Sequence, residues 1–208
     1  MSSLIQMQAV VEAPHYEDEF SCPWAVSEVL PFSMITLSGE MTYAKIGLVI
    51  AQLAKYNQIK LTGDRLTVLN QIIAAESLVL PGGIQVTSET QSTISPSCCC
   101  GLETWRDWVD FLKTGASPWL GHDLSPWIEN LGDAIRIWSD GGMQAASKAF
   151  HIDVSRDRFA KALILVEQDL QAFLFCVDSW AKEMGFAQSS KLCQKFDKCF
   201  NLKQDYGR

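Results

Sequence analysis

The sequence lacks the long apolar runs that a membrane-spanning helix requires. Such a helix needs roughly 18 consecutive apolar residues, and the longest candidate, residues 44–53, is interrupted by Lys45, Gly47 and Gln52. Residues 1–11 also lack the basic segment and following apolar segment of a secretory signal. We therefore expect a cytoplasmic protein that does not contact the membrane.

Clustered basic side chains are missing as well. The 208-residue chain has 17 Lys and Arg residues against 24 Asp and Glu residues, which gives a net charge of −7 and a pI of about 4.9. Nucleic acids and anionic membrane surfaces bind clustered Lys and Arg, so we expect neither as a partner. The densest charge run, residues 17–19, is acidic and suits either a solvated surface or a contact with a basic partner.

The motifs of several common enzyme classes are also absent. Neither Gly-x-Ser-x-Gly nor His-Glu-x-x-His occurs in the chain. The glycine pairs at residues 82–83 and 141–142 lack the spacing of a phosphate-binding loop, and no carboxylates form an Asp-x-Asp pattern. The sequence therefore assigns no catalytic residue, and it leaves open whether the protein is an enzyme.

The composition that is present suits a globular protein. Hydrophobic residues make up 48% of the chain and charged residues 20%, and a chain of this length buries about 70% of its unfolded surface. We expect one domain over residues 1–208. Residues 1–23 should be a partly irregular N-terminal segment, and residues 186–208 should form a tail with a short helix and a frayed end.

Apolar periodicity predicts both helices and strands. Asp64 is the predicted N-cap of one helix, and residues 81–83 are the predicted turn of a hairpin because glycine supplies the positive φ of a tight turn. The strands come mainly as neighbours joined by turns, which favours an α+β fold with an antiparallel sheet packed against several helices. Helices are predicted at residues 42–56, 64–76 and 103–113, and strands at residues 32–37, 77–80, 84–87, 92–95, 134–138 and 150–154.

The strongest periodicity lies near the C-terminus. Apolar residues recur there at alternating steps of four and three, a heptad-like stripe that predicts one long amphipathic helix from the N-cap Ser155 to Gly185. We expect this helix to pack across the sheet, with a dimer seam as the alternative, so the chain is a monomer or a homodimer. The stripe contains Phe159, Leu163, Val166, Leu170, Phe173, Val177, Trp180 and Met184, and a second set expected to widen the buried face contains Ala162, Leu165, Leu174 and Phe175.

Three of the seven cysteines are consecutive, namely Cys98, Cys99 and Cys100. A secreted disulfide scaffold would be shorter and its cysteines more evenly spaced, so we expect reduced thiols. The triplet precedes the helix predicted at residues 103–113, and a helix N-terminus favours a thiolate. Because adjacent side chains diverge, at most two of the three can face one ion. The triplet is therefore a candidate site for zinc or iron, a candidate reactive thiol, or a set of small buried apolar side chains.

A candidate partner for the triplet lies in the loop predicted at residues 117–126. His122 offers a further metal ligand, or it completes a Cys-His nucleophile pair, and Asp123 follows it directly. The alternative is that His122 hydrogen-bonds the loop backbone. The candidate metal ligands are therefore Cys98, Cys99, Cys100 and His122.

Tryptophan is concentrated between residues 105 and 138. Trp119 and Trp127 each follow a Ser-Pro pair, and proline keeps its predecessor extended, so we expect both indoles on a loop surface. Such a surface suits a proline-rich peptide, a cation or a flat ligand, whereas the alternative is a core wall lined with tryptophan. The candidate binding residues are Trp119, His122, Asp123, Trp127, Trp138 and Asp140.

Residues 98–142 resemble small bacterial proteins without an assigned activity. The small, acidic, tryptophan-rich α+β profile is in addition similar to immunity proteins that neutralise bacterial toxins. This resemblance implies a protein partner and assigns no role to any residue.

Two functional hypotheses follow from the sequence. The first is a non-catalytic binding protein, an immunity-type or regulatory partner that contacts a protein or a small ligand through the loop at residues 117–127. The second is a thiol-based or metal-binding protein centred on Cys98, Cys99 and Cys100. The two differ in whether the thiols are accessible, because a functional thiol site needs an exposed cysteine.

Overall fold

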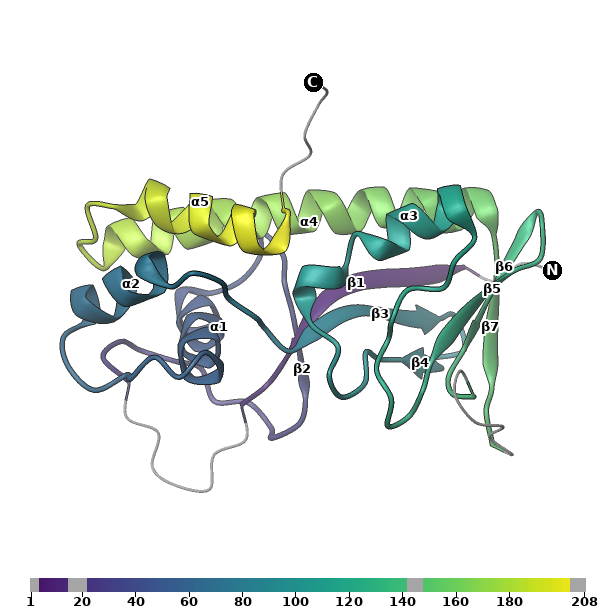
Figure 1. Cartoon of the computed structure of the whole chain (residues 1–208), viewed down its shortest axis with the longest axis horizontal. Helices are drawn as coiled ribbons and strands as arrows, with labels where there is room; N and C mark the ends of the chain where they lie inside the picture. Colours follow the sequence, from purple (N-terminus) through teal and green to yellow (C-terminus); the bar gives the residue numbers. More distant parts are fainter. Residues whose placement is uncertain (1–3, 15–21, 142–147, 203–208) are drawn as a thin grey trace. The chain divides into compact units, whose positions relative to one another are not determined.

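The computed structural model of the chain describes residues 4–14, 22–141 and 148–202 (Figure 1). These residues gather into two compact units. Unit 1 comprises residues 1–10 and 81–168, and unit 2 comprises residues 11–80 and 169–208. The single domain expected over residues 1–208 stays a prediction. Residues 1–3 and 15–21 of the expected N-terminal segment and residues 203–208 of the expected tail lie outside the described residues.

The described part of the chain has the predicted α+β fold. One sheet has the strand order β2-β1-β3-β4 and a second has the order β5-β6-β7, in which both neighbouring pairs are antiparallel. The strands are β1 (Ile5–Glu12), β2 (Met34–Thr36), β3 (Gly82–Ser88), β4 (Thr93–Ile94), β5 (Trp127–Asn130), β6 (Ala134–Trp138) and β7 (His151–Ser155). The helices are α1 (Tyr43–Tyr56), α2 (Arg65–Ala74), α3 (Asp107–Thr114), α4 (Arg156–Glu183) and α5 (Ser189–Phe200), with a 3-10 turn η1 (Leu102–Thr104).

The core of unit 1 is aromatic. Trp108 of α3 stacks on Phe159 of α4 with ring centroids 6.0 Å apart, and Phe111 meets the same ring edge-on at 5.9 Å. Arg106 and Glu167 form an ion pair of 2.9 Å between the same two segments. Trp105 and Trp108, three positions apart, are both buried in this core.

The core of unit 2 surrounds helix α1. Every residue from Ile46 to Ala54 is buried, which is the pattern of a helix covered on all sides. Trp24 donates a hydrogen bond from Nε1 to the carbonyl of Gly47 at 2.8 Å, and its ring meets Trp180 edge-on at 5.3 Å. A side chain on Gly47 would lie 2.5 Å from the Ala25 carbonyl oxygen, so glycine is required for this close approach.

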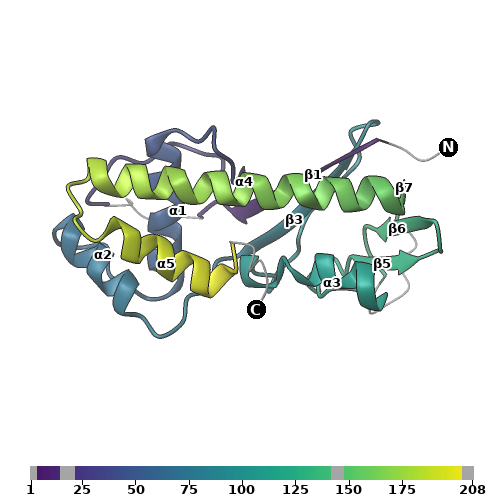
Figure 2. The ribbon, with the colours of Figure 1, turned by 90° about the horizontal axis from the view of Figure 1, so that it is seen from above.

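Helix α4 matches the predicted long helix, and Figure 2 shows it as one uninterrupted element. Ser155 accepts a hydrogen bond from the backbone N–H of Arg158 at 3.4 Å, as an N-cap does, and Gly185 ends the helix with a φ of +73°. The predicted stripe from Phe159 to Trp180 is buried within the chain. The second apolar set is half wrong, because Ala162 and Leu174 are buried but Leu165 and Phe175 are 58% and 75% exposed.

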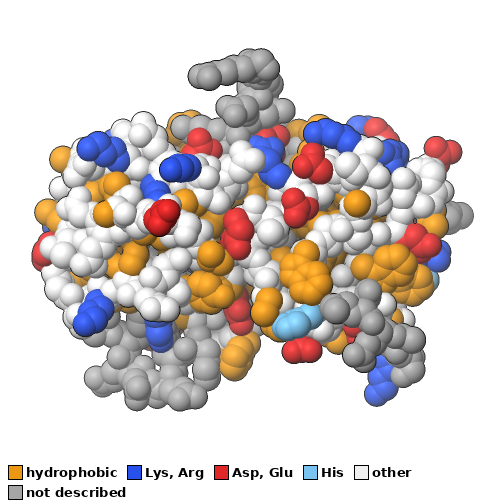
Figure 3. All heavy atoms as spheres, in the orientation of Figure 1, with side chains coloured by type: hydrophobic (Ala, Val, Ile, Leu, Met, Phe, Trp, Pro, Cys, Tyr) orange, Lys and Arg blue, Asp and Glu red, His pale blue; other side chains and the backbone are white. Residues whose placement is uncertain are grey.

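No helix among the described residues has both the length and the apolar character that crossing a membrane demands. Basic and acidic side chains are interspersed over the face shown in Figure 3.

The hairpin predicted around residues 81–83 is wrong. Gly82 and Gly83 lie inside β3 rather than in a turn, and residues 77–80 form no strand. The Gly82 N–H donates to the Cys100 carbonyl at 3.1 Å, and a side chain on Gly83 would lie 3.2 Å from both Cys100 Sγ and Pro96 Cβ. These glycines therefore serve the close approach of residues 96–100 to the strand. The sequence interpretation also missed β1 and β5.

Substitution of Phe159 should test the core of unit 1. Phe159→Ala removes the ring that packs against both Trp108 and Phe111, so we expect the free energy of unfolding to fall by about 3–5 kcal/mol. Leu165→Ala, on an exposed part of the same helix, should change it by less than about 0.5 kcal/mol. Chemical denaturation followed by circular dichroism measures both values, and equal losses would contradict this assignment of the core.

Candidate thiol and histidine site

Two loops of unit 1 build the candidate site. The first runs from β4 to η1 and carries the cysteine triplet, and the second joins α3 to β5 and carries His122. The Ser97 N–H donates to the Leu120 carbonyl at 2.9 Å, and the Ser97 hydroxyl donates to the Asp123 carbonyl. These backbone contacts fix the two loops side by side, so residues that are 24 positions apart in sequence face one another.

The structure brings together Cys98, Cys99 and His122, three exposed side chains. Their sulfur and nitrogen atoms all lie within 4.8 Å of one another. Cys98 Sγ is hydrogen-bonded to His122 Nδ1 at 2.7 Å, while His122 Nε2 lies 3.9 Å from Cys98 Sγ and 4.0 Å from Cys99 Sγ. Asp123 adjoins the group, since Cys98 donates to its Oδ2 at 3.7 Å. The cluster therefore combines two thiols, an imidazole and a neighbouring carboxylate.

Cys100 does not join this cluster. Its side chain is buried, and its thiol donates to the Trp119 carbonyl at 3.6 Å. Burial raises the pKa of Cys100 to about 11, so this thiol stays protonated at neutral pH. Cys99, which precedes it, has a φ of +66°, and this left-handed residue turns the chain between the exposed pair and the buried third thiol. Two of the three thiols thus share one site, the largest number that the sequence interpretation allowed.

The expected stabilisation of a thiolate by a helix N-terminus is wrong. The residues after the triplet form only the short turn η1, and α3 begins at Asp107. Partial loss of solvent raises the pKa of Cys98, and the neighbouring Cys99 and the Asp123 carboxylate raise it further. Cys98 is therefore a protonated thiol at neutral pH, because the surrounding groups disfavour additional negative charge.

Gly121 makes the contact between the two loops sterically feasible. Its φ is +103°, a region that favours glycine. A side chain there would lie 2.7 Å from the backbone carbonyl carbon of Ser97 and 2.8 Å from the Cys98 carbonyl oxygen. Nothing in the sequence pattern marked this glycine, although it directly precedes His122.

The tryptophans of the candidate binding surface occupy two different settings. Trp119 is 45% exposed in the second loop, with its ring centroid 6.2 Å from that of His122. Trp127 lies on strand β5 rather than in the loop, and it stacks on Trp138 of β6 with ring centroids 6.0 Å apart. The ring centroid of His151 on β7 lies 4.8 Å from that of Trp138. Trp119 thus adjoins the thiol cluster, while Trp127 and Trp138 form a cross-strand pair.

Asp140 makes local backbone contacts. Its Oδ1 accepts hydrogen bonds from the N–H of Ser125 at 2.8 Å and from the N–H of Gly141 at 2.7 Å. These bonds attach the end of the second loop to the turn after β6. A role for Asp140 in binding stays a prediction.

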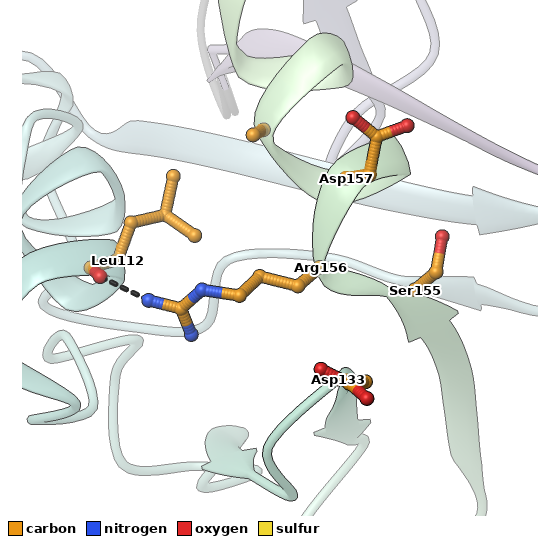
Figure 4. Close-up of a pocket in the computed structure, with 6 residues that line it drawn as sticks. Leu112, Asp133, Ser155, Arg156 and Asp157 are labelled. Atoms are coloured by element: carbon orange, nitrogen blue, oxygen red, sulfur yellow. Dashed lines mark hydrogen bonds between the residues drawn. The ribbon is translucent and has the colours of Figure 1, made fainter.

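A separate hollow of about 510 Å³ lies at the start of α4, and the sequence interpretation missed it. Figure 4 shows that Arg156 points across it toward Leu112, whose carbonyl oxygen accepts a hydrogen bond from the guanidinium. Asp133 and Asp157 also line the hollow, so its two carboxylates oppose the charge of its single arginine. The lining therefore has a net charge of −1, which disfavours an anion.

Substitution of Gly121 should disturb the cluster. Gly121→Ala introduces both a strained positive φ and a clash with the Ser97 backbone, whereas Gly132→Ala introduces the strain alone, because no atom lies within 4 Å of its side-chain position and its φ is +84°. We expect Gly132→Ala to lower the free energy of unfolding by about 1–2 kcal/mol, and Gly121→Ala to lower it by about 1–3 kcal/mol more. Denaturant titration compares the two, and equal losses would show that the loops do not meet closely.

No protein-family model, curated protein or solved structure matches this chain. The function is therefore argued from the chemistry of the site, which is also the sounder basis because one fold supports many functions. The site offers two exposed thiols, one imidazole and an exposed indole within one pair of loops.

Proposed function

We propose that the protein binds a thiophilic divalent cation, zinc being the best fit, through Cys98, Cys99 and His122. The observation that carries this proposal is the convergence of two sulfurs and one imidazole nitrogen within 4.8 Å on the exposed surface of unit 1. Zinc bonds thiolate sulfur at about 2.3 Å and imidazole nitrogen at about 2.0–2.1 Å, so tetrahedral ligands stand roughly 3.5 Å apart. His122 Nε2 lies at nearly this distance from both sulfurs.

The electrostatics of the cluster also favour a cation. Without one, partial loss of solvent raises the pKa of Cys98, and the neighbouring Cys99 and the Asp123 carboxylate raise it further. A bound divalent cation would lower the pKa of the thiol instead, since it stabilises thiolates and releases their protons on binding. The same neighbours that disfavour a free thiolate therefore favour the metal-bound form.

A three-residue ligand set has a chemical consequence. Structural zinc sites are closed by four protein ligands, whereas sites with three protein ligands leave the fourth position to water or substrate. Cys98, Cys99 and His122 form such a set, and Trp119 lies beside the imidazole. An exchangeable ligand at the fourth position is thus part of the proposal, with the Asp123 carboxylate adjacent to it.

Zinc titration of the reduced chain tests the proposal. We expect one zinc ion to bind, with the dissociation constant raised at least about 100-fold by Cys98→Ser, Cys99→Ser or His122→Ala, because each removes a direct ligand. Cys100→Ser is the matched control, since its thiol points to the Trp119 carbonyl instead. Calorimetry gives the affinity, and elemental analysis of the isolated complex gives the stoichiometry.

Two outcomes would contradict the metal proposal. One is the absence of stoichiometric zinc binding, and the other is a loss of zinc affinity in Cys100→Ser as large as that in Cys98→Ser.

Alkylation of the metal-free chain tests the other thiol hypothesis, in which a cysteine of the cluster is a reactive nucleophile. With its pKa raised, Cys98 should react slowly at neutral pH and faster as the pH rises through and above the ordinary cysteine range. Fast reaction at neutral pH would instead indicate a thiolate activated by His122.

A second candidate function is that of a non-catalytic binding protein acting through the loop at residues 117–127. The observation that favours it is the exposure of two large apolar side chains in this loop, Trp119 at 45% and Leu124 at 62%. Indole rings are common among the residues that dominate binding energies. An immunity-type or regulatory role is the form of this candidate that the acidic, tryptophan-rich composition favours.

Alanine substitutions test the second candidate. If the loop is the contact surface, Trp119→Ala and Leu124→Ala should each abolish capture of a specific partner by the immobilised chain, while the free energy of unfolding stays within about 0.5 kcal/mol. Leu30→Ala is the control, because Leu30 is 78% exposed but lies outside the loop. Unchanged capture by Trp119→Ala would remove the loop from consideration.

A further inference from the structure

The exposed side of helix α4 carries its own regular stripe. A shift of two positions turns a helix by about 200°, so residues two places before each member of the buried stripe lie on the opposite side. These residues again follow steps of four and three, and we call them the outer stripe. They are Asp157, Lys161, Ile164, Gln168, Gln171, Phe175, Asp178 and Lys182.

The outer stripe exposes apolar side chains that a solvated helix face does not need. Phe175 is 75% exposed and Ile164 is 54% exposed. The side chains of Lys161 and Asp157, at one end of the stripe, are 71% and 73% exposed, and those of Lys182 and Asp178 at the other end are 65% and 26% exposed. Two charged ends thus flank two exposed apolar positions on a single helix.

The order of residues in the outer stripe is self-complementary. Read from the N-terminal end it runs acid, base, apolar, glutamine, and then glutamine, apolar, acid, base. When this order is laid against its own reverse, every acid faces a base, each apolar residue faces the other apolar residue, and glutamine faces glutamine. The pairs across an antiparallel axis between residues 169 and 170 are Asp157 with Lys182, Lys161 with Asp178, Ile164 with Phe175, and Gln168 with Gln171.

We propose that the outer stripe of α4 binds the same stripe of a second copy of this chain, as an antiparallel helix pair with two-fold symmetry. A self-complementary patch is what a two-fold dimer requires, because both partners present the same surface. Steps of four and three keep a seam straight along two supercoiled helices. The proposal rests on α4 alone and is independent of the proposed metal site.

Charge selects the antiparallel arrangement. A parallel, in-register pair would place Asp157 on Asp157 and Lys161 on Lys161 of the partner, and like charges in contact are destabilising. Within one chain, Asp157 already bonds Lys161 at 2.8 Å and Asp178 bonds Lys182 at 2.6 Å. The antiparallel pair joins these couples into two networks of four alternating charges, one at each end of the seam.

The dimer should be reversible. Only the Ile164–Phe175 layer and its symmetry equivalent are apolar, and glutamines occupy the centre of the seam. The interfaces of obligate homodimers are more hydrophobic than such a seam. The expected behaviour is therefore a dimer that forms with rising protein concentration and weakens with rising salt.

Paired charge exchanges in the full-length chain test this arrangement. One variant combines Asp157→Lys with Lys161→Asp, and the other combines Asp178→Lys with Lys182→Asp. Each variant keeps the net charge and the acid–base pair four residues apart within one chain. In its homodimer, however, like charges face each other at all four charged pairs of the seam. Sedimentation equilibrium should show the dissociation constant of each variant raised at least about tenfold relative to the unchanged chain.

The decisive measurement is an equimolar mixture of the two variants. In the heterodimer every acid again faces a base, so the mixture should associate as strongly as the unchanged chain although neither variant does so alone. A folding defect cannot produce this rescue. Leu30→Gln, which alters an exposed leucine outside α4, should leave association unchanged. A chain that stays monomeric at all concentrations, a variant that dimerises normally, or a mixture without rescue would each overturn the proposal.

Discussion

Helix α4 has to bury one stripe of apolar side chains, and both units depend on that stripe. A helix is stable in water mainly because one face packs away from solvent, and the steps of four and three keep this face in line over 28 residues. The same period also determines which residues lie on the opposite face, the outer stripe. Phe159, Leu163 and Val166 enter the core of unit 1, and Leu170, Phe173, Val177 and Trp180 enter the core of unit 2.

Much of the fold could be predicted because it depends on local signals. The stripe of α4, the N-caps Asp64 and Ser155 and the α+β class follow from residues that are near one another in sequence. The errors arose where contacts between distant segments determine the local structure. The glycines at residues 82–83 indicated a turn, but Gly83 lies in β3, where residues 96–100 pass close to its backbone. Phe175 is apolar, which indicated burial, but its helical position faces solvent.

The candidate site was predictable in composition but not in geometry. Three consecutive thiols and a loop histidine are unusual enough to be noticed, and the divergence of adjacent side chains limits one ion to two of them. The sequence could not identify which two, because Cys99 adopts a positive φ that separates the exposed Cys98 and Cys99 from the buried Cys100. The approach of His122 depends on Gly121 against the Ser97 backbone, a contact that no local pattern encodes.

The two thiol hypotheses differ in the source of the positive charge that would stabilise a thiolate at Cys98. An activated nucleophile needs a lowered pKa, from a helix N-terminus or a nearby positive charge. Around Cys98 the helix starts too late, and partial loss of solvent raises the pKa of its thiol, with smaller contributions from Cys99 and the Asp123 carboxylate. A divalent cation needs this electron-rich surrounding and supplies the missing positive charge itself. The close donor atoms support the proposed metal site, whereas the raised pKa of Cys98 argues against an activated nucleophile.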